Sequence, residues 1–333
     1  MVREGAADLR SHGGLLSSAR HFVIFNPVSG RSGGGARILN YEGLLRDALD
    51  DVTFVATTYP GHERELSAKA VEDGYDVIVA VGGDGTWSNV ADPIIESGLD
   101  DVAFAVLPSG TGNDFGRNFG YDPRSPESAV QVLAAGHTRL VDAGRLETPS
   151  AAEHAPDRME PRNFLNLIGF GFDIAVIDAA EGARFLRGEL LYKLTALQQL
   201  VRFPGFDSRV VSASGADRAT RTLMLTVSNG RFFGGGFPIA PAATVDDGRL
   251  HACIIGDAPF ATRFRLFNLA ERGRHIESER VEVIDDRSFH LHFDAPPRFE
   301  MDGDVRRSSE AVMEVRCLPG ALRVVAPPVD APQ

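Results

Sequence analysis

The stretch Asp76–Thr86 reads DVIVAVGGDGT and decides the fold of the first part of the chain. Val77–Val81 is an unbroken apolar run, which is typical of a strand buried on both faces of a parallel sheet. The glycines that follow turn the chain sharply, and the next residues, up to about Glu96, predict a helix. Asp84 falls at this strand-to-helix junction, where backbone N–H groups at a helix N-terminus favour an anion.

The same alternation of strand, loop and helix extends outward in both directions. Short apolar runs at 21–25, 52–57 and 102–107 predict further strands, and 63–73 predicts a helix. Asn26-Pro27 and a glycine-rich loop end the first strand, and Ser109–Asp114 ends the last. This rhythm predicts an α/β domain built on a doubly wound parallel sheet.

Beyond about residue 140 the pattern changes to short β-rich runs, at 164–168, 209–213, 223–228, 250–255, 281–284, 289–293 and 311–316. One long helical stretch, Arg184–Arg202, interrupts them, and Thr148–Arg162 has the composition of an exposed loop insertion. We therefore expect a tail at 1–20, a nucleotide-binding α/β domain at 21–140, a β-sandwich-like domain at 141–326 and a tail at 327–333. The last strand is free to return to the first domain.

Composition excludes several classes of function. The chain has 333 residues with a formal net charge of -12, which opposes nucleic-acid binding because phosphate neutralisation needs excess Lys and Arg. The apolar runs are too short to cross a bilayer, and the first twenty residues lack the apolar centre of a signal peptide, so we expect a cytoplasmic protein. Cys253 and Cys317 alone provide no zinc or disulfide framework.

The two lysines exclude two familiar kinase architectures. Lys69 follows Ala68 and Lys193 follows Tyr192, so neither forms the Gly-Lys-Ser/Thr of a Walker loop. The strand lysine of eukaryotic-type protein kinases is also absent. A phosphotransferase built from this sequence must therefore use another architecture.

Three glycine-rich loops follow strands of the predicted parallel sheet, at 26–30, 82–86 and 109–114. Open α/β sheets bind ligands at the carboxyl ends of their strands, and glycines let backbone N–H groups approach a phosphate. Any one such loop alone is better explained by turns and helix caps. Three on successive strand ends, with carboxylates among the glycines, favour a site for a triphosphate and a metal ion.

Here the sequence resembles the diacylglycerol kinase catalytic domain family, which includes bacterial lipid kinases and sphingosine and ceramide kinases. Gly82–Thr86 alone is shared with NAD kinases and phosphofructokinases. More specific are Ser109–Phe115, Val227–Gly230 followed by Gly234–Gly236, and Glu300–Asp304. The resemblance spans residues 21 to about 326. It implies a nucleotide-binding α/β domain, a β-sandwich-like second domain and a site in the cleft between them.

The resemblance also implies roles for individual residues. ATP would bind with its phosphates on the first two loops and further contacts from two threonines: Asn26, Pro27, Val28, Ser29, Gly30, Gly83, Asp84, Gly85, Thr86, Trp87, Ser88, Asn89, Thr58 and Thr111. Asp84 would hold a magnesium-bridged phosphate. Asp302 would be the general base that deprotonates the lipid hydroxyl, with Asp304 beside it. The alternative for Asp302-Gly303 is an ordinary hairpin turn.

Two departures from the family pattern concern charge. Asn89 stands where the family usually has Glu. The family's structural magnesium site has an acidic residue three positions before an Asp-Gly pair, where this chain has Thr244. Asp247 could still be a metal ligand, with Asp246 compensating and Asp304 a further candidate, but a turn at Asp247-Gly248 explains the sequence as well.

These observations predict an ATP- and Mg²⁺-dependent lipid kinase that phosphorylates a hydroxyl of diacylglycerol or a related lipid. One alternative is an NAD kinase-like phosphotransferase, although Ser228-Asn229-Gly230 replaces the motif expected there. Another is a regulatory module that binds nucleotide without catalysis. The presence of both Asp84 and Asp302 argues against a non-catalytic regulatory module.

The predicted partner is a lipid at a membrane surface, with no nucleic acid, and a homodimer is compatible with the sequence. Because the chain is acidic and has no polybasic cluster, we expect a weak, transient contact made by apolar residues, which strengthens as salt screens the repulsion from anionic lipid. The first candidates are Phe232, Phe233 and Phe237. A stripe of Phe185, Leu186 and Leu190 is a second candidate, for which core packing is the favoured interpretation.

Overall fold

The computed structural model describes residues 19–27, 34–122, 125–148, 159–182 and 189–328, with backbone alone at 34–36, 180–182 and 189–194. The chain divides into two compact units, Met1–Asp142 with Gly320–Gln333, and Ala143–Pro319. The sequence had suggested a boundary at 140/141. Strands β5 (Thr138–Glu147) and β17 (Val312–Val325) each contribute residues to both units.

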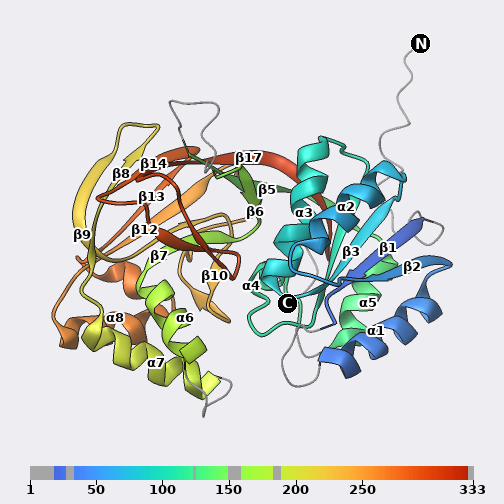
Figure 1. Cartoon of the computed structure of the whole chain (residues 1–333), viewed down its shortest axis with the longest axis horizontal. Helices are drawn as coiled ribbons and strands as arrows, with labels where there is room; N and C mark the ends of the chain where they lie inside the picture. The colour runs from blue at the N-terminus through green and yellow to red at the C-terminus, as the bar shows by residue number, and fades with distance from the viewer. Residues whose placement is uncertain (1–18, 28–33, 123–124, 149–158, 183–188, 329–333) are drawn as a thin grey trace. The chain divides into compact units, whose positions relative to one another are not determined.

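The first unit is a parallel sheet with helices on both faces (Figure 1). Strands run in the order β2-β1-β3-β4-β17, and each neighbouring pair is parallel. Helix α1 packs against α5, and α2 against α3, on opposite faces. The element bounds are β1 Arg20–Phe25, α1 Gly34–Ala48, β2 Asp51–Ala56, α2 His62–Glu72, β3 Val77–Gly82, α3 Asp84–Ser97, β4 Ala103–Pro108, α4 Asp114–Arg117 and α5 Pro126–Ala135.

The central strands explain where the loops lie. Every residue of β3 and β4 is buried, as expected of apolar strands covered by helices on both faces. In the register of the sheet, Val81 pairs with Phe25 and Gly82 pairs with Pro108. The loops that follow β1, β3 and β4 therefore leave the sheet from the same edge. The doubly wound parallel domain predicted from the sequence is confirmed.

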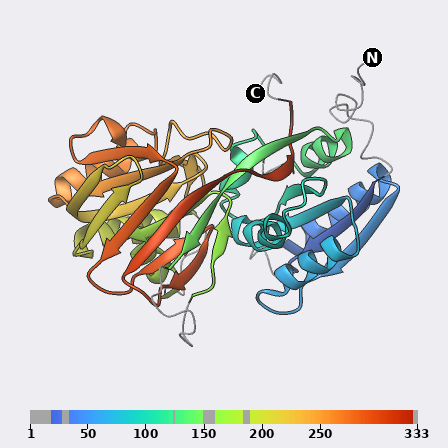
Figure 2. The ribbon, with the colours of Figure 1, turned by 90° about the horizontal axis from the view of Figure 1, so that it is seen from above.

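The second unit is β-rich, with an antiparallel path β16-β15-β7-β9-β8-β14-β17 and β12 and β13 continuing from β9. Figure 2 shows several of these strands side by side. The bounds are β6 Arg162–Phe164, β7 Leu167–Gly171, α6 Phe172–Gly182, α7 Glu189–Arg202, β8 Phe206–Ser212, β9 Asp217–Ser228, β10 Phe232–Phe233, β11 Phe237–Pro238, β12 Leu250–Gly256, α8 Phe260–Ala270, the 3₁₀ helix η2 His275–Glu277, β13 Val281–Asp286, β14 Ser288–Phe293, β15 Arg298–Met301 and β16 Asp304–Arg307.

Alternation along β9 divides the second unit into two apolar clusters. Leu225 and Val227 point into a cluster made only by strands, together with Phe170 and Phe289. Met224 belongs to a second cluster, in which side chains of α6, α7 and α8 cover the other side of the strands. This arrangement confirms the sandwich-like domain that the sequence predicts.

The predicted single strand at 164–168 is wrong. β6 ends at Phe164 and β7 begins at Leu167. The N–H groups of Leu165, Asn166 and Leu167 donate to the carboxylate of Asp302. A side chain therefore interrupts the strand.

The helix predicted at 184–202 corresponds in the described part of the chain to α7 (Glu189–Arg202). Helix α6, which the sequence pattern did not indicate, precedes it. Phe185 and Leu186, and most of the predicted insertion at 148–162, lie outside the described residues, as does the side chain of Leu190. None of the described helices combines the length and the hydropathy needed to span a bilayer.

Candidate active site

Two glycine-rich loops of the first unit touch through their backbones. A Cβ atom at Gly110 would lie 2.5 Å from the Cα of Gly83, and one at Gly83 would lie 3.2 Å from the Cα of Gly110. The N–H groups of Ser109 and Gly110 both donate to the carbonyl of Gly82, at 2.8 and 3.1 Å. Only glycine permits this approach, so the loops after β3 and β4 form one continuous backbone surface.

Asn113 and Asp84 hold the second of these loops in place. Asn113 adopts a left-handed conformation (φ 54°), and its side chain accepts from the N–H of Gly110 and donates to the carbonyl of Gly110. Asp84 accepts from the N–H of Phe115 at 2.9 Å. Burial raises the pKa of the Asp84 carboxyl above its ordinary value, an effect opposed by backbone N–H groups at 113–115. Asp84 is therefore a structural link between the two loops as well as a candidate ligand.

Two carboxylates converge beside Gly112. A Cβ atom there would lie 3.0 Å from Oδ2 of Asp84 and 3.4 Å from Oδ2 of Asp114. Asp114 also pairs with Arg117 at 3.4 Å. Mg²⁺ is commonly held by one or two carboxylates and completed by phosphate oxygens and water, so this donor pair fits a magnesium–phosphate site. The sequence had not included Asp114 among the metal or nucleotide residues, because the loop shows no spacing that pairs it with Asp84.

The residues after Gly83 have different roles in α3. Thr86 and Ser88 are buried, and Asn89 is half-buried. The prediction that Trp87 contacts nucleotide is wrong for its side chain. The indole is fully buried and donates from Nε1 to the carbonyl of Ala80 at 3.1 Å, so it packs in the core.

The remaining predicted nucleotide contacts are near the surface of the first unit. Asn26 is half-buried and donates to Glu63 at 3.4 Å, while Pro27 is exposed. Thr58 is exposed and its hydroxyl lies 3.2 Å from Nδ1 of His62. Thr111 is exposed in the loop beside Gly110. Val28, Ser29 and Gly30 lie outside the described residues.

The contact between the loops predicts the effect of one methyl group. Gly110→Ala must push the backbone of Gly83 away, so ATP affinity should fall at least about tenfold while the chain remains folded. Gly43→Ala is the matched control, since a Cβ atom at Gly43 meets nothing within 4 Å. Isothermal titration with ATP and Mg²⁺ measures both. Equal affinities in the two variants would remove these loops from the nucleotide site.

In the second unit, Asp302 is the first residue of the two-residue turn between β15 and β16. Its φ of 48° and the φ of 91° at Gly303 are those of a type I′ hairpin, so the hairpin interpretation is correct. The side chain folds back and accepts N–H groups from Leu165 at 2.6 Å, Asn166 at 2.9 Å and Leu167 at 3.0 Å. These three donors fix the orientation of the carboxylate.

Other polar side chains form hydrogen bonds with the segment between β6 and β7 that faces Asp302. Asn229 donates to the carbonyl of Leu165, and Asn166 donates to the carbonyl of Phe232. Glu300 accepts from the N–H of Gly303 at 2.7 Å and so fixes the hairpin from the other side. The motif around Asn229, which supports the family resemblance in the sequence, thus lies beside the predicted base.

The predicted metal ligands of the second unit are not brought together. Among the described residues, no group of three or more His, Cys, Asp or Glu side chains is arranged to bind a metal ion. Asp247 accepts from the N–H groups of Thr244 and Arg249 and contacts His251, so it closes a turn. Asp246 is exposed, and Asp304 pairs with Arg306 at 3.6 Å. The turn interpretation of Asp247-Gly248 is the one that the structure supports.

Asp173 is a buried acid that the sequence did not single out. It is 4% exposed in the first turn of α6, and neither carboxylate oxygen makes a hydrogen bond. Gly169 faces it with no room for a side chain, and a Cβ atom at Gly169 would also lie 3.3 Å from Cγ of Glu300. Burial raises the pKa of Asp173 to about 7, only partly opposed by the N–H groups of Asp173 and Ile174. A lone Gly-Phe-Asp gives no sequence signal for such burial.

This raised pKa predicts a pH dependence of stability. The folded state retains the Asp173 proton up to about pH 7, whereas the unfolded chain loses it near pH 4, so the free energy of unfolding falls as pH rises between them. Asp173→Asn removes this titration. Its stability relative to the unsubstituted chain should grow by about 2–3 kcal/mol between about pH 5 and about pH 8.

Urea unfolding at the two pH values measures this difference. Asp178→Asn, at an exposed position of the same helix, is the control and should show little change with pH. If the stability of Asp173→Asn relative to the unsubstituted chain is the same at both pH values, the Asp173 carboxyl of the folded chain is already ionised at the lower pH.

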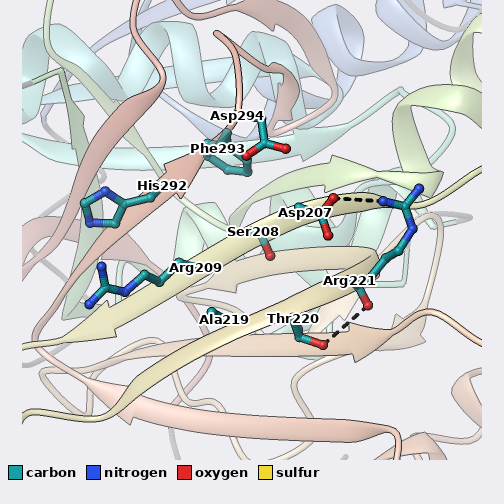
Figure 3. A pocket seen from close by; sticks show the side chains of 9 residues that line it. All are labelled: Asp207, Ser208, Arg209, Ala219, Thr220, Arg221, His292, Phe293 and Asp294. Atoms are coloured by element: carbon teal, nitrogen blue, oxygen red, sulfur yellow. Dashed lines mark hydrogen bonds and ion pairs between the residues drawn. The ribbon is translucent and has the colours of Figure 1, made fainter.

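A hollow in the second unit lies away from these residues. It has a volume of about 470 Å³ and lies over β8, β9 and β14, as Figure 3 shows. Its arginines are already neutralised, because Arg221 pairs with Asp207 at 2.8 Å and Arg209 with Asp217 at 2.6 Å. None of the predicted site residues lines it.

Comparisons with known proteins agree with this division of the chain. Residues 20–146 match the family model described as the diacylglycerol kinase catalytic domain, and residues 166–326 match the YegS C-terminal NAD kinase beta sandwich-like domain. A diacylglycerol kinase of Mycobacterium tuberculosis is 28% identical over 309 residues, which cover 92% of this chain and 94% of the relative. One from Staphylococcus saprophyticus is 26% identical, with 85% and 88% covered.

A solved structure shares the fold. The crystal structure of a diacylglycerol kinase from Bacillus anthracis superposes with a TM-score of 0.68 at 18% identity, covering 93% of this chain and 97% of that chain.

Proposed function

Because the chain belongs to the diacylglycerol kinase family and is a lipid kinase of that family, we propose that it transfers the γ-phosphoryl group of ATP to a hydroxyl of diacylglycerol or a closely related lipid. Membership of this family implies ATP as the phosphoryl donor. The substrate, the magnesium ion and the roles of individual residues are the parts that we propose here.

The observation that carries this proposal is the fused backbone surface made by Gly83 and Gly110. Phosphoryl transfer depends mainly on positioning and charge neutralisation, which backbone N–H groups and a metal ion supply. The glycine-rich backbone of the loops after β3 and β4 would supply such N–H groups to the phosphates. Asp84 keeps this surface in one arrangement by holding the N–H of Phe115.

Asp84 and Asp114 would hold Mg²⁺ at the phosphates. Their carboxylates converge beside Gly112, which leaves the remaining coordination positions to phosphate and water. When bound, the ion would neutralise charge that develops on the phosphoryl oxygens. Asp84 is held in place by the N–H of Phe115, which donates to its carboxylate. Asp114 is held by its ion pair with Arg117.

Asp302 is the residue that we propose as the proton acceptor. Phosphoryl transfer to an alcohol requires a carboxylate that is ionised and aligned with the attacking hydroxyl. Three backbone N–H donors fix the direction of the Asp302 carboxylate, and the left-handed turn places it at the tip of a hairpin. The hydrogen-bonded turn thus supports the chemical role that the family resemblance implies.

Product analysis tests the function directly. The purified chain is incubated with labelled ATP, Mg²⁺ and one acceptor at a time: diacylglycerol, dialkylglycerol, sphingosine, ceramide or NAD. We expect label in a phosphorylated glycerolipid. Label in NADP would identify an NAD kinase, and tight ATP binding without any labelled product would identify a regulatory module.

Asp302 has both a chemical and a structural role, and its replacement should show both. Asp302→Asn removes the proton acceptor and one of the oxygens that receive backbone N–H groups. Turnover should fall about 100-fold or more, and the free energy of unfolding by about 1–3 kcal/mol, with ATP affinity retained.

Asp304→Asn is the control, since Asp304 lies in the same hairpin and pairs with Arg306 at 3.6 Å. Turnover, unfolding and ATP titration are measured on both variants at a temperature where each is folded. Near-normal turnover in Asp302→Asn would show that the lipid proton leaves by another route.

A further inference from the structure

Helices α7 and α8 lie side by side on one side of the second unit (Figure 1). Arg263 joins them, because its guanidinium donates to the carbonyls of Leu200 and Phe203, at 2.9 and 2.8 Å, and pairs with Asp257. This side chain is buried. The end of α7 and the beginning of α8 are therefore tied together as one support.

Helices α7 and α8 carry four large apolar side chains that are 41% or more exposed. Phe260 and Phe264 are 47% and 45% exposed, and their rings stand 6.3 Å apart at a helical spacing of four. Leu197 and Val201 repeat the same spacing on α7, with 41% and 64% exposed. Exposed apolar side chains on two helices that contact each other are candidates for an apolar docking surface.

Arginines flank these apolar residues. Arg265 and Arg272 on and after α8 are exposed and form no ion pair with any described residue. Besides Arg263, which is paired with Asp257, the segment 259–273 contains two arginines and one glutamate, in a chain whose net charge is -12. A hollow of about 420 Å³ lies beside them, lined by Phe264, Arg265, Asn268, Leu269, Glu271 and Arg272. The local charge is thus opposite in sign to that of the whole chain.

We propose that this surface, made of Leu197, Val201, Phe260, Phe264, Arg265 and Arg272, docks the protein on a lipid bilayer that contains anionic lipids. The combination of exposed phenyl rings with unpaired cations matches the acyl–headgroup boundary of such a bilayer, where apolar groups insert and arginines meet phosphate. The choice of a bilayer rests on the proposed function, because the acceptor of a lipid kinase resides there.

This surface replaces the one expected from the sequence. Phe232, Phe233 and Phe237 are half-buried, and the ring of Phe237 packs 5.5 Å from that of Phe267. Net charge alone had predicted binding that strengthens with salt. Cations concentrated on the docking surface reverse that expectation, because salt screens their attraction to anionic lipid more than it aids apolar insertion.

Flotation of the full chain with vesicles tests the proposal. We use phosphatidylcholine vesicles with and without about 30% phosphatidylglycerol, at about 0.05 M and about 0.5 M salt. The chain should partition onto the anionic vesicles and lose affinity several-fold at high salt. Phe260→Ser with Phe264→Ser should reduce partitioning about tenfold or more, and Arg265→Gln with Arg272→Gln should abolish most of its salt dependence.

Two double variants serve as matched controls. Leu39→Ser with Leu99→Ser removes exposed apolar residues of the first unit, and Arg280→Gln with Arg307→Gln removes exposed arginines that have no described ion pair. Both should float like the unsubstituted chain. The proposal would be overturned if the unsubstituted chain did not float with the vesicles. It would also be overturned if the Phe260→Ser, Phe264→Ser variant (the phenylalanine variant) floated as well as the Leu39→Ser, Leu99→Ser control.

Two further measurements separate docking from catalysis and from self-association. The phenylalanine variant should keep full turnover on a short-chain diacylglycerol dissolved as monomers and lose it on vesicles. If no lipid is phosphorylated by the unsubstituted chain, the proposed function fails while flotation still reports on docking. If sedimentation shows that this substitution dissolves a dimer and leaves flotation unchanged, the surface joins two copies and membrane docking is wrong.

Discussion

In each of the two units, the loops that carry candidate site residues depend on an aspartate that accepts hydrogen bonds from backbone N–H groups. In the first unit Asp84 holds Phe115, and in the second Asp302 holds three successive N–H groups at 165–167. An aspartate can do this because its two oxygens accept several bonds at once, each charge-assisted and costly to leave unmade. Loops that would otherwise sample many conformations are thereby held in one.

The same carboxylates are the candidates for chemistry, and the two roles support each other. A metal ligand or a proton acceptor acts best when its orientation is already fixed, because no ordering remains to be done as the reaction proceeds. Substitution at either aspartate therefore affects stability together with turnover. Gly83, Gly110 and Gly112 complete the arrangement by leaving room for a neighbouring backbone or carboxylate.

The first unit could be predicted well from the sequence because its central strands are buried on both faces and therefore consist of continuous apolar runs. The second unit could be predicted less well. The strand expected at 164–168 is broken by Asp302, a residue more than 130 positions away, and no local pattern reports such a contact. The burial of Trp87 and Asp173 has the same origin. Both depend on which elements pack over them, and a linear sequence does not contain that information.

The net charge of the chain was a poor guide to the charge of any one part of its surface. The net charge of -12 describes the chain as a whole, whereas Arg265 and Arg272 stand unpaired beside exposed phenyl rings on a single helix pair. Many other exposed arginines of the second unit, such as Arg209, Arg221 and Arg249, are neutralised by neighbouring carboxylates. Where cations and apolar groups coincide depends on the fold, so the docking surface that we propose could be identified only once the helices were placed.

The claim that the loops joined by Asp84 form the nucleotide site is tested most directly by hydrogen exchange of the intact chain with and without ATP and Mg²⁺. The account predicts that nucleotide slows exchange at the backbone amides of 82–89 and 109–117, and leaves 206–222, around the hollow of Figure 3, unchanged. Protection confined to residues 206–222, or absent from both loops at saturating nucleotide, would contradict it.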